Sequence, residues 1–305
     1  MQAPPRTVLV PTDFSATADA AVTLGGAMAA AVEAELHLLH VRVLMADPAL
    51  DDGHHATVEE LLSATDEKVL EALKSLPAHD HPAIRHHVVR GLSIAEAILE
   101  VVSNEGIDLI VMGTHGHRGV RRLLLGSVAE EVVRTSPVPV LTVRAEDGVR
   151  PGLPTRLLVG CDFSSSSRSA VRWAGSWARA TGGTVTLAHA VEPVVYPEFY
   201  AVDIFPEDLM DRIATRSREA MEELAHEELR GVPYTVDVLH GSPVGALIDA
   251  ARDGNHDLLI VGHRGLSQLE ELLIGSVASG LVRKSPIPVL TTRSTDTAGD
   301  GGSGR

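Results

Sequence analysis

The sequence predicts an α/β protein of two tandem domains, each an open five-stranded parallel sheet flanked by helices. Three observations lead to this fold class. The length of 305 residues suits two domains of roughly 150 residues each. The chain repeats itself, with matching residues such as Asp13 and Asp162 standing 149 positions apart. Within each repeat, short apolar runs alternate with longer amphipathic stretches, the pattern of a sheet that carries helices on its faces.

The internal repeat defines the domains. Segments from four parts of the first repeat return in the same order in the second. We therefore predict a first domain at residues 1–146, a polar linker at 147–154 and a second domain at 155–293. The tail, residues 294–305, is rich in glycine and is expected to be disordered. The matching pairs are Val8–Ser15 with Leu157–Ser164, Asp108–Gly113 with Asp257–Gly262, Leu125–Ala129 with Ile274–Ala278, and Ser136–Thr142 with Ser285–Thr291.

The elements of the first repeat can be assigned in order from their periodicity. The run Leu109–Met112 is apolar without alternation, as expected for a parallel strand covered on both faces. Strands joined by helical crossovers give a Rossmann-like sheet, whose ligands bind beyond the carboxyl ends of the strands at the switch point of the strand order. We expect strands near Thr7–Pro11, Leu36–Val41, Ile84–Val89, Leu109–Met112 and Val138–Val143, and helices near Ser15–Ala34, Ala56–Ser75, Ser93–Glu105 and Ser127–Thr135.

Composition and charge exclude several classes of function. The chain carries 26 Lys and Arg against 41 Asp and Glu, a net charge of −15, which speaks against nucleic-acid binding. No apolar run approaches the roughly 18 residues of a membrane span, and the N-terminus lacks the apolar core of a signal peptide. The single cysteine, Cys161, fits a reducing compartment. We therefore expect a cytoplasmic protein without membrane or nucleic-acid partners.

A glycine-rich loop follows the fourth strand of each repeat. Both copies fit the pattern G-x2-G-x9-G-S, and glycines let a backbone turn tightly and approach an anion. The Gly-Ser pair opens a helix whose N–H groups and dipole favour phosphate, and its serine can cap that helix or donate to a phosphate oxygen. One such loop alone would be ordinary turn chemistry, whereas two copies with the upstream Asp13 or Asp162 favour an anion site. The loops are Gly113, Gly116, Gly126 and Ser127, and Gly262, Gly265, Gly275 and Ser276.

With these motifs the sequence resembles the universal stress protein family, tandem type, over residues 6–144 and 155–293. The resemblance extends to the ATP-binding branch, because both repeats keep the loop glycines. It implies that the loop holds the phosphates, that the first-strand Asp lies near the nucleotide, and that Val41 and Ala190 meet adenine through their backbones. The predicted nucleotide-binding residues are Pro11, Thr12, Asp13, Val41, Gly113, His115, Gly116, Arg118, Gly126, Ser127 and Val128 in the first repeat, and Gly160, Cys161, Asp162, Ala190, Gly262, Arg264, Gly265, Gly275, Ser276 and Val277 in the second.

The predicted function is ATP binding by a stress-response regulator, with one site per domain. There is no P-loop lysine, only Asp13 or His115 as a base, and only a few candidate arginines, so we expect no enzyme. Slow ATP turnover with Mg²⁺ bridging the phosphates, an adenylyl-transferring activity, and a nucleotide-independent scaffold remain alternatives. The resemblance also implies pairing through the terminal edge strands, within the chain or in a homodimer.

Charge predicts that the two sites differ. The loop of the first repeat carries Arg121 and Arg122, and the corresponding residues of the second are Glu270 and Glu271. Cations help to hold a triphosphate and carboxylates oppose it. We therefore expect tighter ATP binding in the first repeat, with solvated surface charges as the alternative.

Other candidate residues have simpler explanations. The histidines at 79, 81, 86 and 87 lack good metal-ligand spacing, which favours solvated loop residues over a metal site. No protein metal cluster is therefore expected. Cys161 is expected to be a small core residue and not a redox sensor. Trp173 and Trp177 share one helix face, which favours a place in the core or an interface over a stacking site.

Overall fold

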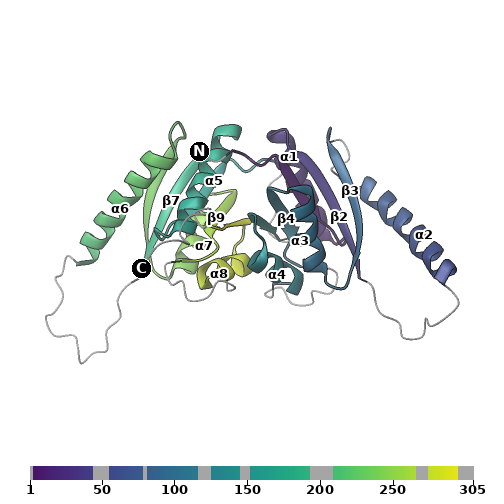
Figure 1. Cartoon of the computed structure of the whole chain (residues 1–305). Coiled ribbons are helices and arrows are strands. Elements are labelled where there is room, and N and C mark those ends of the chain that lie inside the picture. Colours follow the sequence, from purple (N-terminus) through teal and green to yellow (C-terminus); the bar gives the residue numbers. More distant parts are fainter. Residues whose placement is uncertain are drawn as a thin grey trace, which may run out of the picture. The chain divides into compact units, whose positions relative to one another are not determined.

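The computed structural model describes residues 3–43, 55–77, 81–115, 125–144, 152–192, 209–265 and 274–294, with side chains from residue 64 in the second of these ranges. The chain forms two compact units that divide between Leu153 and Pro154. Each unit contains strands that alternate with helices along the chain (Figure 1). The predicted tail beyond residue 294 lies outside the described residues.

The first unit is a parallel sheet in the order β3-β2-β1-β4-β5. Every predicted element of this repeat is present, with ends that shift by a few residues. The elements are β1 (Thr7–Pro11), α1 (Ala16–Ala31), β2 (Glu35–Val43), α2 (His55–Lys74), β3 (Ile84–Gly91), α3 (Ile94–Glu105), β4 (Leu109–Gly113), α4 (Ser127–Thr135) and β5 (Val140–Val143).

The second unit repeats this arrangement, with strand order β10-β9-β6-β7-β8 and parallel pairing throughout. The predicted fold class, two α/β units each with a five-stranded parallel sheet, is confirmed. The elements are β6 (Arg156–Gly160), α5 (Ser165–Thr181), β7 (Thr184–Val191), α6 (Leu209–Glu228), β8 (Tyr234–His240), α7 (Pro243–Asp253), β9 (Leu258–Gly262), α8 (Ser276–Lys284) and β10 (Val289–Thr292).

Both faces of each sheet are covered by helices. A Cβ built on Gly25 of α1 would meet the Val10 side chain of β1 at 2.6 Å. In the second unit, a Cβ on Gly160 would meet Leu247 of α7 at 3.0 Å. Gly160 stands one position after the residue that matches Val10 in the second repeat. Because successive strand residues point to opposite faces of a sheet, α1 and α7 cover opposite faces of the repeated sheet. The central residues of the strands are therefore buried, and Val8, Leu9 and Val10 of β1 have no exposed surface.

The last strand of each unit is shorter than predicted. The expected strand Val138–Val143 begins only at Val140, and its counterpart in the second repeat begins at Val289. The cause is a local turn, in which the Ser136 hydroxyl donates to the Val138 carbonyl at 2.8 Å and accepts from the Val138 N–H at 3.2 Å. Pro139 then has no N–H to offer a neighbouring strand. Each strand stands at the end of its own unit's order.

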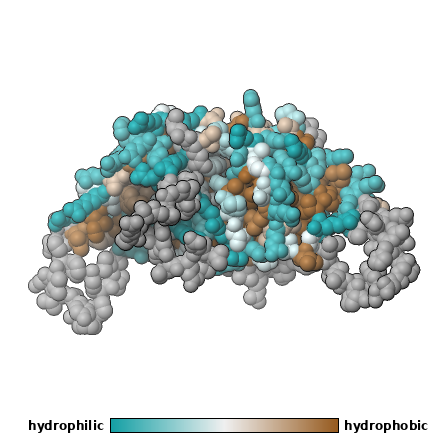
Figure 2. Space-filling model, in the orientation of Figure 1, coloured by the Kyte–Doolittle hydropathy of each residue, from teal (hydrophilic) through white to brown (hydrophobic). Residues whose placement is uncertain are grey.

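The described surface is mostly hydrophilic on the face shown in Figure 2, with hydrophobic residues in separate smaller areas. None of the helices in the described ranges combines the length and the apolar character that a membrane span requires.

The two tryptophans belong to the core of the second unit, as predicted. Trp173 and Trp177 of α5 are 3% and 0% exposed, and their rings stack with centroids 5.6 Å apart. The indole N–H of Trp177 donates to the Pro154 carbonyl at 2.8 Å, which ties the helix to the start of the unit. A buried carbonyl that loses its donor costs more than the net value of the hydrogen bond.

Trp177→Phe should therefore lower the free energy of unfolding of the second unit by about 1–3 kcal/mol. Trp173→Phe is the matched control, because it removes a stacked indole of the same helix and keeps the Trp177 hydrogen bond. The protein has only two tryptophans. The fluorescence of the remaining one therefore follows this unit during urea unfolding. Equal losses in the two variants would refute the role of the hydrogen bond.

Candidate functional site

A cavity of about 620 Å³ lies at the carboxyl ends of the strands in the first unit. Strand β1 pairs with β2 on one side and with β4 on the other, so the strand order reverses direction there. This is the switch point at which open parallel sheets bind their ligands. The cavity walls come from the ends of β1, β2 and β4 and from the beginnings of α3 and α4.

The structure brings the predicted residues of the first repeat together around this cavity. Nine of them line it, although they come from four separate stretches of the chain. Gly116 and Arg118 lie outside the described residues, as do Arg121 and Arg122. The predicted residues that line the cavity are Pro11, Thr12, Asp13, Val41, Gly113, His115, Gly126, Ser127 and Val128.

The turn after β1 holds Asp13 in a defined place. The Thr12 N–H continues the sheet by donating to the Leu39 carbonyl at 2.8 Å. The Phe14 N–H donates to the Thr12 hydroxyl at 2.9 Å, and the Ser15 N–H donates to Asp13 Oδ1 at 3.0 Å. Phe14 has a φ of 62°, a left-handed conformation that is rare for a residue with a side chain. Such conformations persist where surrounding structure enforces them, often at functional sites.

His40 was missed by the sequence reasoning and is part of this turn. Its Nδ1 lies 2.8 Å from the Thr12 carbonyl, and because a carbonyl only accepts, Nδ1 carries the hydrogen. The imidazole also packs on Phe14, with centroids 5.0 Å apart. The second repeat has the same arrangement, since His189 Nδ1 lies 2.7 Å from the Cys161 carbonyl. The recurrence of a histidine at matching positions was the signal in the sequence.

The glycine at the end of β4, Gly113, is required by a packing contact that the sequence analysis did not predict. A Cβ on Gly113 would lie 2.9 Å from Thr17 Cγ2 and 3.1 Å from the Thr17 backbone carbon. Its missing side chain therefore lets β4 pack against the first turn of α1, beside the cavity that Gly113 lines. The next loop contact is the Gly126 N–H, which donates to the Thr114 carbonyl at 2.8 Å and closes the loop onto α4.

Helix α4 begins at the cavity without a side-chain cap. Of the two roles expected for Ser127, capping the helix is excluded, because Gly126 is the N-cap residue and Ser127 is the first residue inside the helix. Donation to a phosphate oxygen stays a prediction. Gly126 has an extended backbone (φ −64°, ψ 144°), and the N-cap position makes no side-chain hydrogen bond to the first turn. By contrast, Ser15 and Ser93 cap α1 and α3. An uncapped helix start beside a cavity is suited to bind an anion.

The second repeat collects its predicted residues at the corresponding edge. Gly160 ends β6 and Gly262 ends β9, and Gly275 is the N-cap of α8, which also lacks a side-chain cap. Cys161 and Asp162 follow β6, Ala190 lies near the end of β7, and Ser276 and Val277 begin α8.

The polar groups of this second edge bond to one another across the loop. The hydroxyl of Ser166 donates to the Arg264 carbonyl, and the Ser164 hydroxyl oxygen lies 3.4 Å from the same carbonyl. Ser164 also donates to Asp162 Oδ1 at 2.5 Å. A Cβ on Gly265 would lie 2.6 Å from Asp162 Oδ2, so the loop lies directly on this carboxylate. The first repeat has Thr17 where the second has Ser166.

The histidines that were expected to be solvated loop residues divide into two groups. His81 lies before β3, where its Nδ1 bonds locally with Ala83, while His79 lies outside the described residues. The expectation is wrong for His86 and His87, which lie inside β3. Burial lowers the pKa of both imidazoles.

A duplicated parallel sheet whose strand order reverses at the first strand of each unit places the protein in the class of Rossmann-like α/β proteins. Within this class, the model of the Universal stress protein family matches residues 5–144 and 154–293. The chain therefore belongs to the universal stress protein family, with two family domains in tandem.

Individual relatives agree with this assignment. A universal stress protein of Mycobacterium tuberculosis is 25% identical over 245 residues, covering 79% of this chain and 82% of the relative. A shorter one from Thermus aquaticus is 33% identical over 138 residues, 45% of this chain and 97% of its own length. The crystal structure of a universal stress protein from Archaeoglobus fulgidus, 22% identical, has a TM-score of 0.65 and covers 95% of this chain and 98% of that one, which shows the shared fold.

Cys161 is a buried residue, as predicted, and is 5% exposed. Burial raises the pKa of its thiol above the ordinary value, and the charge of Asp162 acts in the same direction. Only the thiolate is an effective nucleophile, so both protonation and access restrain the reaction of this group.

Iodoacetamide at pH 8 should therefore alkylate the native protein at least about ten times more slowly than the urea-unfolded chain. Because the protein has one cysteine, mass spectrometry of the intact chain measures the rate at this single site. Similar rates in the two states would contradict a buried, protonated thiol.

Proposed function

We propose that this protein binds an adenine nucleotide, in the first place ATP, in the cavity of its first domain. The observation that carries the proposal is the cavity of about 620 Å³ at the switch point, bordered by the uncapped start of α4. Ligand pockets for small molecules have volumes of about 300–1,000 Å³. A nucleotide would fill such a space with its phosphates toward the helix and its base toward the apolar wall.

The start of helix α4 would hold the phosphates of the nucleotide. The dipole of α4 and the N–H groups of its first turn together favour a polyanion. The exposed Ser127 stands at this helix start and has a hydroxyl to donate to a phosphate oxygen. Mg²⁺ brought in with the nucleotide would neutralise part of the phosphate charge, and Asp13 lines the same cavity.

Other residues that line the cavity would hold the base and the ribose of the nucleotide. Val41 of β2 and the side chains of Ile94 and Ile98 give one wall its apolar character. A purine ring would bury apolar surface there, while the backbone beside Val41 offers polar groups to its edge. The exposed carboxylate of Asp13, held by the turn after β1, is a suitable acceptor for ribose hydroxyls.

We further propose that the first site binds ATP more tightly than the second. In the second repeat, Ser164 and Ser166 hold the loop at Arg264, and Asp162 accepts the Ser164 hydroxyl. A nucleotide there would have to displace these bonds. The charges of the loop, with Arg121 and Arg122 against Glu270 and Glu271, act in the same direction.

Binding and not turnover is the proposed activity. Among the described residues that line the cavity there is no lysine or arginine to stabilise a transferring phosphoryl group. We infer that the bound nucleotide biases the conformation or assembly of a stress-response protein. Steady-state phosphate or pyrophosphate release from ATP tests the enzymatic alternatives, since activity that is lost with nucleotide affinity would replace this proposal by an enzyme.

Ser127→Asp should weaken ATP binding by about tenfold or more, equivalent to about 1.4 kcal/mol, because it sets a carboxylate against the phosphates. The same carboxylate favours the helix dipole of α4, so the melting temperature should not fall. Calorimetric titration of the full chain with Mg²⁺-ATP measures the affinity.

Ser276→Asp is the matched control at the second site and should cause a smaller loss of the tightest binding. Equal losses in the two variants would remove the inequality of the sites. If the parent protein binds no adenine nucleotide and carries none after purification, as judged by mass spectrometry of the extracted ligand, the nucleotide-independent scaffold is the better description.

A further inference from the structure

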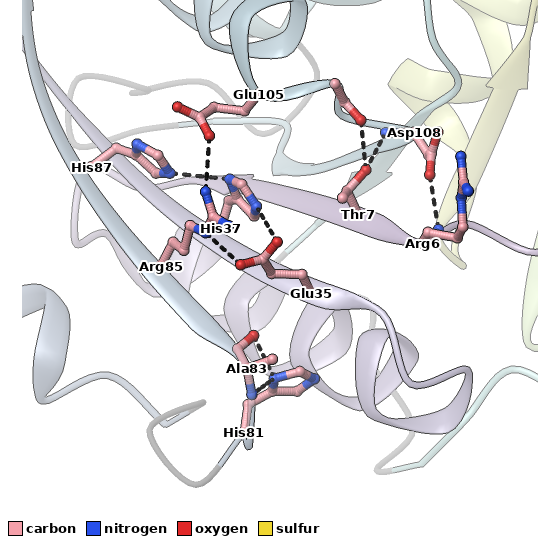
Figure 3. A network of polar contacts seen from close by, with 11 residues as sticks. Arg6, Thr7, Glu35, His37, His81, Ala83, Arg85, His87, Glu105 and Asp108 are labelled. Carbon is pink, nitrogen blue, oxygen red and sulfur yellow. Dashed lines mark hydrogen bonds and ion pairs between the residues drawn. The ribbon is translucent and has the colours of Figure 1, made fainter.

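A second cluster of functional side chains lies in the first domain, toward the amino-terminal edge of the sheet and away from the nucleotide cavity. His37 belongs to β2, His87 to β3 and Glu105 is the last residue of α3. Figure 3 shows the three side chains turned toward a common region. Among the described residues they form a group whose possible ligand atoms all lie within 4.8 Å of one another.

We propose that His37, His87 and Glu105 bind a divalent transition-metal ion, with Zn²⁺ as the best match to the ligand chemistry. Two imidazoles and one carboxylate are a known three-ligand set for Zn²⁺, with a fourth position left for water. The ion would be separate from any Mg²⁺ that accompanies a nucleotide, because hard cations prefer oxygen ligands.

The two imidazoles are already at a suitable separation. His87 Nε2 lies 3.0 Å from His37 Nδ1. Two nitrogens bound to one tetrahedral Zn²⁺ at about 2.0–2.1 Å lie roughly 3.3 Å apart, so a small ring movement would admit the ion.

The surroundings of the other nitrogen of His37, Nε2, support the proposed metal site independently. His37 is 1% exposed, and its Nε2 has no hydrogen-bond partner within the described parts of the chain. The Glu35 carboxylate is the nearest acceptor, with Oε2 at 3.5 Å. Metal binding at Nδ1 would fix the hydrogen on Nε2, facing this carboxylate. Metal-bound histidines usually have such a carboxylate or carbonyl behind them.

Arg85 balances the charge of the cluster while no ion is bound. Its Nε donates to Glu35, and its Nη1 donates to Glu105 Oε2 at 3.3 Å (Figure 3). Its side chain is 56% exposed, so it can turn toward solvent when an ion takes the Glu105 carboxylate. Glu35 would keep its contact with Arg85 and stay oriented toward His37.

The second domain lacks the equivalent ligands, which makes it an internal reference. Strand register places Thr186 at the position of His37 and Asp237 at the position of His87. Thr186 Oγ1 instead lies 3.0 Å from His256 Nε2. We therefore expect one such ion per chain, in the first domain alone.

The test is a Zn²⁺ titration of the tag-free full chain after chelator treatment, without nucleotide, against a coloured zinc indicator. The wild-type protein should bind one Zn²⁺ with higher affinity than its remaining histidines provide. His87→Gln and Glu105→Gln should each weaken this binding about tenfold or more. His86→Gln is the matched control, since it is the neighbouring half-buried histidine of β3 outside the cluster, and it should leave the affinity unchanged.

Co²⁺ in place of Zn²⁺ gives a second readout, because tetrahedral coordination produces visible absorption bands that weak surface binding does not. These bands should appear in the wild type and in His86→Gln and be absent from His87→Gln. Glu105→Gln changes a partly exposed residue at the end of α3 and keeps the test valid if His87→Gln unfolds. Equal Zn²⁺ affinity in wild type and both ligand variants, or no tetrahedral Co²⁺ spectrum, would overturn the proposal. Neither result depends on ATP binding.

Discussion

The parallel pairing of β1 with β2 on one side and with β4 on the other is the constraint on which the candidate site depends. Because crossovers between parallel strands are right-handed, the connections that leave to the two sides of β1 must cover opposite faces of the sheet. The carboxyl end of β1 is therefore left between two diverging loops. Asp13, Val41 and the start of α4 meet at this point although they are far apart in the sequence.

The two repeats show how one backbone framework can carry different chemistry. The turn after the first strand, with its left-handed Phe14 or Phe163 and its histidine hydrogen bond, is built in the same way in both. The residues beyond this turn differ, since the serines of the second repeat hold their loop by hydroxyl hydrogen bonds. We infer that duplication kept the hydrogen bonds that define the turn and left the surrounding side chains able to diverge.

The first domain separates its two proposed sites by charge. The carboxyl edge of the sheet presents helix N–H groups, which suit a polyanion. The opposite edge carries imidazoles and the carboxylates of Glu35 and Glu105, which suit a cation. Strand β2 reaches both, with His37 near its start and Val41 near its end. A single rigid strand can therefore carry two sites without either ligand competing for the other's groups.

The sequence by itself determined the elements, the duplication and half of the residues that line the cavity, because these follow from local patterns. Apolar runs define strands, and Ser15 and Ser93 stand where their side chains can cap a helix. Only the tertiary structure decided that Gly113 makes room for Thr17, that Gly126 is the N-cap of α4, and that His37, His87 and Glu105 meet. These outcomes depend on strand register and helix packing, which join residues that have no local relation in the chain.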